Sequence, residues 1–143
     1  METLALADFE GCSELQIKQH IAEHYSGSGR YDCGGPEEQQ ALLSSLDNFE
    51  ILIAYESVGN WGCDSSSWFL LRDKNTGDLF ENHGSHCSCY GFEGQWDLEA
   101  TSLEYISSDK FYLSAGGYDD EADKNAEAVK EYVRFAIAKA ESA

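Results

Sequence analysis

The spacing of apolar residues predicts a first helix over residues 13–25. Ser13 is a good helix cap, and Gln16, three residues later, completes the spacing of a capping box. The apolar side chains of the segment then give a partial stripe at helical steps: Leu15, Ile17, Ile21 and Tyr25. This pattern indicates an amphipathic helix with one face toward a core.

A glycine-rich stretch at residues 26–36 interrupts this pattern and predicts a loop. It lacks the Gly-Lys-Ser/Thr ending of a phosphate-binding loop, so a recognition loop or a plain linker is expected. A second helix follows from Pro36 to about Leu46. Proline suits the first turn of a helix, and Glu37 and Glu38 favour its positive end.

The middle of the chain changes to the alternation typical of strands. Residues 49–58 place Phe49, Ile51, Ile53 and Tyr55 on one predicted face, and residues 66–73 form a second strand. Lys-Asn-Thr-Gly-Asp at 74–78 indicates a hairpin turn into a short third strand from Leu79 to Asn82. Residues 83–95 are predicted to be irregular. Residues 96–106 show a weak alternation of apolar and polar side chains, which indicates a fourth strand.

The last part of the chain carries the clearest helical pattern, at residues 121–141, where apolar side chains recur at three- and four-residue steps. The predicted fold is therefore a single α+β domain over residues 1–143. It has an antiparallel sheet of three to four strands, N-terminal helices, and a long C-terminal helix packed on one face of the sheet.

Negative charge dominates the composition. The chain has 27 acidic and 9 basic residues, a formal net charge of −18. Such a field repels nucleic-acid phosphates and attracts basic protein surfaces. The sequence therefore disfavours direct binding of nucleic acid and favours a basic partner, such as a protein that itself holds nucleic acid. The alternative is that the charge serves solubility alone.

The five cysteines indicate a reducing compartment. No apolar stretch is long enough to cross a membrane, and the first residues lack the basic start and apolar run of a secretory signal. An odd number of cysteines without an export signal fits thiols or metal ligands better than a disulfide framework. The expected location is the cytoplasm.

A metal site is one interpretation of the cluster at residues 83–90. Cys87 and Cys89, with His86 and the more distant Cys63, supply four ligands of the types that zinc prefers. The spacing differs from common zinc sites, however, because one half of the site is a lone cysteine. The alternative is a tight loop with small cysteines packed beneath aromatic side chains, so we expect no cofactor, with zinc kept as the alternative.

A catalytic thiol at Cys87 beside His86 is a weaker hypothesis. Neighbours in sequence do not supply the spatial contact that a nucleophile needs from its base, and acidic surroundings disfavour a thiolate. A nucleotide-binding role rests on no motif. The sequence therefore predicts a protein that is not an enzyme.

Residues that could contact a basic partner are exposed acids and aromatic side chains in turns. Acids in the helical segments and aromatics near the hairpin are the candidates: Glu14, Glu23, Glu37, Glu38, Trp61, Tyr90, Asp119, Asp120, Glu121 and Asp123. The acids at 119–123 do not follow the calcium-loop pattern, and acids before a helix also stabilise its dipole.

The stretch GSHCSCYGFEGQW at residues 84–96, after a hairpin with a Gly-Asp turn, resembles a motif of small bacteriophage and prophage proteins. The resemblance spans Tyr55–Trp96 and does not include the helical regions. It implies a phage setting, in which small acidic proteins often inhibit host defences, as anti-CRISPR and anti-restriction proteins do, in several cases by imitating the charge of DNA. The resemblance thus implies an inhibitor in a bacterial host's cytoplasm that blocks a nucleic-acid-handling defence complex by charge mimicry and steric occlusion.

Overall fold

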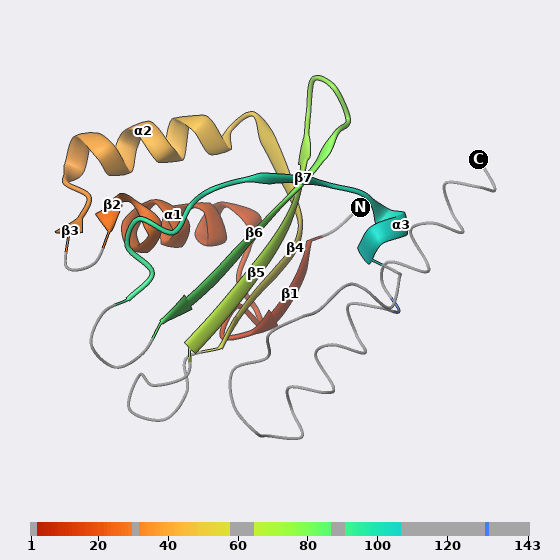
Figure 1. Cartoon of the computed structure of the whole chain (residues 1–143), viewed down its shortest axis with the longest axis horizontal. Helices are drawn as coiled ribbons and strands as arrows, with labels where there is room; N and C mark the ends of the chain where they lie inside the picture. Colours follow the sequence, from red (N-terminus) through yellow and green to blue (C-terminus); the bar gives the residue numbers. More distant parts are fainter. Residues whose placement is uncertain (1–2, 30–31, 58–64, 87–90, 107–130, 132–143) are drawn as a thin grey trace.

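The computed structural model describes residues 3–29, 32–57, 65–86, 91–106 and 131 (Figure 1). The predicted helix at 121–141 lies outside these residues, apart from the single position 131. The described elements follow in chain order: β1 (Leu4–Ala7), α1 (Glu14–Tyr25), β2 (Gly27–Gly29), β3 (Asp32–Cys33), α2 (Pro36–Leu46), β4 (Phe49–Ser57), β5 (Ser65–Asp73), β6 (Leu79–His86), β7 (Glu99–Thr101) and α3 (Leu103–Ile106).

The main sheet is mixed, and not antiparallel throughout as the sequence predicted. Its five strands lie in the order β1-β4-β5-β6-β7, and β1 runs parallel to β4 with Leu4 opposite Ile53. Parallel neighbours need a crossover connection, which the chain between β1 and β4, with α1 and α2, provides. The other pairs in this sheet are antiparallel. The α+β class is confirmed, while the strand count and the sheet type were wrong.

Helix α1 begins as predicted. The Ser13 hydroxyl accepts the Gln16 amide N–H at 3.2 Å, and the Gln16 side-chain oxygen accepts the Ser13 N–H at 2.8 Å, which completes the capping box. Ile17, Ile21 and Tyr25 face the core. Leu15 was wrongly assigned to this stripe, since it is 61% exposed.

A bulge in β4 changes which residues share a face. Ile51 lies opposite Leu71, but Ile53 lies opposite Leu70, so Leu52 is an extra residue in the ladder. Ile51 therefore faces the helices, whereas Ile53 and the residues after it are shifted by one position. The predicted single face of Phe49, Ile51, Ile53 and Tyr55 was wrong for this reason.

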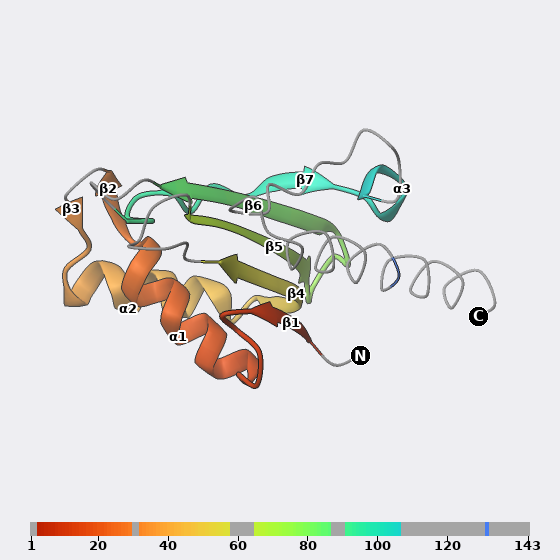
Figure 2. The ribbon, with the colours of Figure 1, turned by 90° about the horizontal axis from the view of Figure 1, so that it is seen from below.

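The two faces of the sheet carry separate cores. Helices α1 and α2 cover one face (Figure 2), where a cluster includes Ile17, Ile21, Tyr25, Leu46, Phe69 and Phe92. The opposite face carries Leu52, Ile53, Tyr55, Trp68 and Leu70, with Leu103 and Ile106 of α3 packed against them. In the described ranges no helix is long and apolar enough to cross a membrane.

Three local segments complete the fold. The β5–β6 turn is the predicted hairpin, and Asp73 Oδ1 accepts the N–H groups of Asn75 and Thr76. Strand β6 continues to His86, so residues 83–86 are not irregular, and the expected fourth strand is the short β7 followed by α3. The glycine-rich segment contains a small antiparallel pair, β2 and β3.

Candidate functional site

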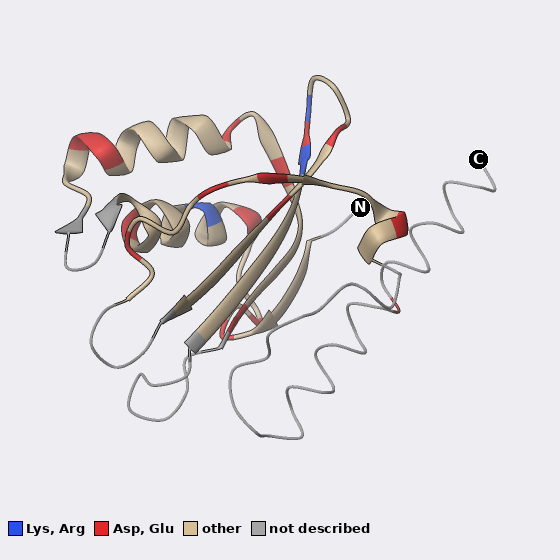
Figure 3. Cartoon of the chain, viewed as in Figure 1, with Lys and Arg blue, Asp and Glu red and all other residues tan. Residues whose placement is uncertain are grey.

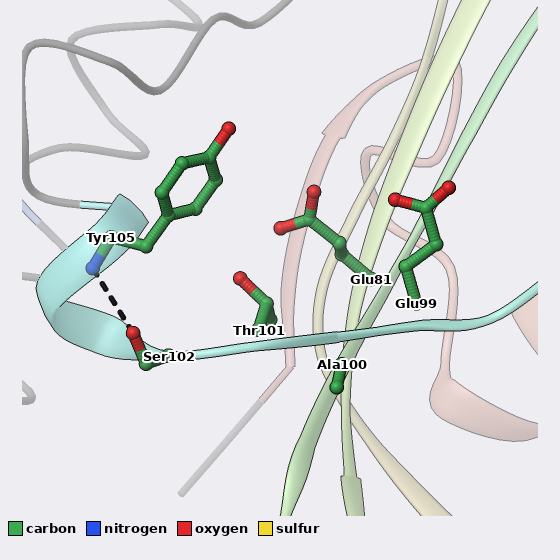
Figure 4. A pocket seen from close by; sticks show the side chains of 6 residues that line it. All are labelled: Glu81, Glu99, Ala100, Thr101, Ser102 and Tyr105. Atoms are coloured by element: carbon green, nitrogen blue, oxygen red, sulfur yellow. Dashed lines mark hydrogen bonds between the residues drawn. The ribbon is translucent and has the colours of Figure 1, made fainter.

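A hollow of about 410 Å³ lies where β6, β7 and the start of α3 meet (Figure 4). We call it the β7 pocket. Its lining combines carboxylates, hydroxyls and one aromatic ring: Glu81, Glu99, Ala100, Thr101, Ser102 and Tyr105. In Figure 4 the side chains of Glu81, Glu99, Thr101 and Tyr105 all extend to the same side of the β7 ribbon.

Strand register brings the two carboxylates together. Glu81 of β6 lies directly opposite Glu99 of β7, and Leu79 lies opposite Thr101. Directly opposed residues of an antiparallel pair point to the same face with Cβ atoms about 4.5–5.5 Å apart, and like charges there repel. The pair therefore concentrates negative charge on one side of β7, and a bound cation would relieve this repulsion.

Glu81 is a buried carboxylate held by neighbouring side chains. The residue is 5% exposed, and its Oε1 lies 2.7 Å from His83 Nε2. Its other oxygen, Oε2, and the Thr101 hydroxyl are both buried, and the Thr101 side chain interacts with the Glu81 carboxylate as a hydrogen-bonding partner. Buried polar groups are usually paired in folded proteins, and His83 and Thr101 are the described partners of this carboxylate.

The charge of Glu81 is maintained by its neighbours. Burial is the largest influence and raises the pKa of the Glu81 carboxyl, but the His83 hydrogen bond, the Thr101 hydroxyl and the His83 charge together bring the pKa below its ordinary value. The Thr101 hydroxyl is thus a side-chain hydrogen-bonding partner of the Glu81 carboxylate, alongside His83. Glu81 is thus a carboxylate at neutral pH.

The rim of the β7 pocket is acidic and partly aromatic. Ser102 immediately precedes α3, and its hydroxyl accepts the Tyr105 N–H at 3.2 Å, which caps the first turn. The Tyr105 residue is 43% exposed. Arg72 lies on the same face of the sheet, but its guanidinium pairs with Glu50 of β4, on the side of β5 away from β6. The pocket is therefore not neutralised by that arginine.

A second buried carboxylate, Glu56, has a structural role on the helix face. Its Oε1 accepts the Tyr25 hydroxyl at 2.7 Å, and its Oε2 lies 2.9 Å from His20 Nε2. Burial of the Tyr25 hydroxyl, followed by the charge of Glu56, raises the pKa of Tyr25 well above its ordinary value. Both Glu56 oxygens have partners, so this cluster fastens α1 to β4 and offers no unused group.

The structure describes four of the predicted partner-binding acids. Glu14 is half-buried and engaged internally, since Oε1 lies 3.0 Å from Lys18 Nζ and Oε2 accepts the Ile51 N–H at 3.3 Å. Glu23 on α1 and Glu37 and Glu38 in the first turn of α2 are exposed. Their contact with a partner stays a prediction, as does that of the remaining residues, which lie outside the described ranges: Trp61, Tyr90, Asp119, Asp120, Glu121 and Asp123.

The structure does not describe the side chains of the predicted metal ligands. Cys63, Cys87 and Cys89 lie outside the described residues, and of His86 only the backbone is described. In the described ranges no group of three or more His, Cys, Asp or Glu side chains could hold a metal ion. Cys12 is a free, half-buried thiol beside the helix-face core. The zinc hypothesis and the Cys87 thiol hypothesis stay predictions.

The Glu81 carboxylate makes a testable contribution to stability against acid. Its folded pKa lies below the ordinary 4.5, so its contribution is present above about pH 4.5 and is lost as the pH falls through the lowered folded pKa. We expect the free energy of unfolding of wild type relative to Glu81→Gln to stay constant near neutral pH and to fall below about pH 4.5. Denaturant titrations over this range measure the difference. Asp78→Asn, in the exposed hairpin turn, is the matched control, and a difference that ignores pH would contradict the assignment.

The β7 pocket was not predicted from the sequence, although Leu79–Asn82 was predicted as a strand. The sequence carried one signal of this pocket: Glu81 and His83 continue the strand face of Leu79, where apolar residues would be expected.

Comparison of the chain with protein-family models, with curated proteins and with solved structures gives no match.

Proposed function

We propose that the protein is a non-catalytic binding protein whose acidic surface engages a basic surface of a nucleic-acid-handling protein and occupies it in place of nucleic acid. The narrower form of the proposal, that the partner is a host defence complex, comes from the resemblance of residues 84–96 to the phage motif.

The observation that carries the proposal is how the described charges are arranged. Two of the described basic residues are compensated internally, Lys18 by Glu14 and Arg72 by Glu50, and Lys18 is also buried. Exposed acids, by contrast, lie on separate elements (Figure 3): Asp8, Glu10, Glu23, Glu37, Glu38, Asp47, Asp78, Asp97, Glu99 and Glu104. A surface of this kind attracts a positively charged groove and speeds the encounter with it.

Charge for solubility alone is the competing explanation. Solubility needs only a net charge away from zero, which the exposed acids supply. The two buried carboxylates, Glu56 and Glu81, are paired inside the fold and favour neither explanation. The two explanations differ in whether one basic partner is captured specifically.

Capture from a bacterial lysate tests the proposal. The tagged protein is incubated at low salt, washed with rising salt, and the eluted proteins are identified. We expect one nucleic-acid-handling protein or complex to elute with salt, because binding through many carboxylates weakens as ions screen them. The captured complex should also lose binding of its nucleic acid when the protein is added.

Two controls separate specific recognition from charge. An unrelated acidic protein of similar size and net charge should not capture the same complex. Glu37→Lys with Glu38→Lys reverses two exposed charges at the start of α2 and should weaken capture if that end of the molecule faces the partner. Capture that persists unchanged at high salt, or that the unrelated acidic protein reproduces, would refute the proposal.

A further inference from the structure

Two histidines lie side by side on helix α1. His20 and His24 share one face of the helix, and their ring centroids are 4.4 Å apart with an interplanar angle of 39°. Imidazole nitrogens are ligands that Zn²⁺, Ni²⁺ and Cu²⁺ prefer. With metal–nitrogen distances of about 2.0–2.1 Å, two imidazoles at adjacent positions of one metal ion have centroids roughly 4.5–5 Å apart. The two rings are therefore spaced for binding to one metal ion.

The His20 ring is oriented by a buried carboxylate. Its Nε2 lies 3.1 Å from Glu56 Oε1 and 2.9 Å from Oε2, and Glu56 is 3% exposed. Because an ionised carboxylate only accepts hydrogen bonds, Nε2 carries the proton, and Nδ1 of the neutral ring keeps its lone pair. The Glu56 oxygens are fully used, but the second ring nitrogen of His20 is available. Metal-binding histidines usually donate their other N–H to a carboxylate in this way.

Both rings reach the solvent. The side chain of His20 is 33% exposed and that of His24 is 56% exposed. His24 Nε2 lies 4.0 Å from Glu23 Oε2, too far for a hydrogen bond, and the charge of Glu23 attracts a cation to this place. The described ranges hold no group of three or more His, Cys, Asp or Glu side chains suited to a metal, so water would complete the coordination of an ion held by two imidazoles.

We propose that His20 and His24 bind a divalent transition-metal ion of the class that imidazole prefers, with Glu56 positioning the His20 ring. This site differs from the zinc site predicted at Cys63, His86, Cys87 and Cys89, because it uses two nitrogen ligands on one helix. It does not rest on the proposed function, and it can be measured without a partner.

Titration of the ¹⁵N-labelled full chain with Zn²⁺ near neutral pH is the first test, with the ring nitrogens of the histidines as the readout. We expect saturable shifts of His20 and His24 that are complete near one equivalent of bound metal. Mg²⁺ prefers oxygen ligands and keeps its water, so it should leave these ring nitrogens unchanged. Rings that do not respond to Zn²⁺, or that respond equally to Mg²⁺, would overturn the proposal.

The second test uses His24→Gln, at an exposed position where the fold should tolerate the change. Loss of an outer partner of a metal ligand typically lowers metal affinity by about 10–100-fold, and we expect loss of a ligand itself to lower Zn²⁺ affinity at least tenfold. His83→Gln removes an imidazole on β6 and should leave the His20 shift unchanged. Unchanged Zn²⁺ affinity in a folded His24→Gln protein would refute the site.

The double substitution Cys87→Ser with Cys89→Ser separates the two metal hypotheses. It removes thiols of the predicted zinc site and leaves α1 intact, so the shifts of His20 and His24 with Zn²⁺ should persist. If these shifts disappear with the two thiols, the metal binds at the cysteines and the inference about α1 fails.

Discussion

Replacing Phe92 by alanine should lower the free energy of unfolding by about 3–5 kcal/mol, the usual cost of deleting a buried phenylalanine ring. Phe92 is 5% exposed, and its ring stacks on Tyr25 with centroids 4.9 Å apart and an interplanar angle of 5°. The ring also fills space beside Gly84, where an added Cβ would come within 3.0 Å of it. Denaturant unfolding followed by fluorescence and by circular dichroism measures the change.

Leu15→Ala is the control for this prediction. Leu15 is also apolar but 61% exposed, so its truncation should change stability by about 0.5 kcal/mol or less. Phe92→Leu keeps most of the apolar volume and should fall between the two. A loss for Phe92→Ala no larger than that for Leu15→Ala would show that the ring is not packed as the structure has it.

The segment around Phe92 also connects the core to the β7 pocket. Gln95 accepts the Ser85 N–H through Oε1 at 2.8 Å, and Asn82 Oδ1 accepts the Asp97 N–H at 2.8 Å. These bonds tie residues 91–98 to β6 just before β7 begins. We therefore infer that packing of Phe92 helps set the register that places Glu99 opposite Glu81, and that the site depends on a residue outside it.

The parts of the fold that sequence reasoning predicted are those with local signals. The capping box of α1, Pro36 at the start of α2 and the Gly77 turn each act within a few residues. Strand β1 was missed because its four apolar residues, Leu-Ala-Leu-Ala, show no alternation and its partner lies far along the chain. The β4 bulge was missed because a bulge is defined by pairing with β5 and leaves no mark in the strand itself.

The candidate site shows the same division between local and distant information. Net charge predicted an acidic surface for a basic partner, and charge is a sum that needs no structure. The β7 pocket depends on the pairing of residues 81 and 99, which only the register of β6 and β7 defines. Glu56 was likewise counted as one acid among many, although its contacts with Tyr25 and His20 place it in the core.

Replacing Tyr25 by phenylalanine should cost about 1.5–3 kcal/mol of stability, the range for a hydrogen bond to a charged group. The Tyr25 hydroxyl donates to Glu56 Oε1 at 2.7 Å, and both residues are buried, at 1% and 3% exposed. Without this donor the buried Glu56 carboxylate retains His20 as its described partner, which is partly exposed. Thermal and denaturant unfolding near neutral pH measure the loss.

Tyr55→Phe is the matched control, because Tyr55 is equally buried, lies on the opposite face of the sheet and has no hydrogen bond to a described residue. Its loss should be clearly smaller. In a double-mutant cycle, Glu56→Gln should reduce the cost of Tyr25→Phe, since the two side chains share one hydrogen bond.

The raised pKa of Tyr25 also predicts how this stabilisation depends on pH. The contribution of the Tyr25 hydroxyl to stability is fully present below about pH 10.0, and it is lost as the pH rises through the folded pKa. The advantage of wild type over Tyr25→Phe should therefore shrink in strong alkali. Equal losses for the two tyrosines, or additive effects in the cycle, would mean that the hydroxyl does not stabilise the buried carboxylate.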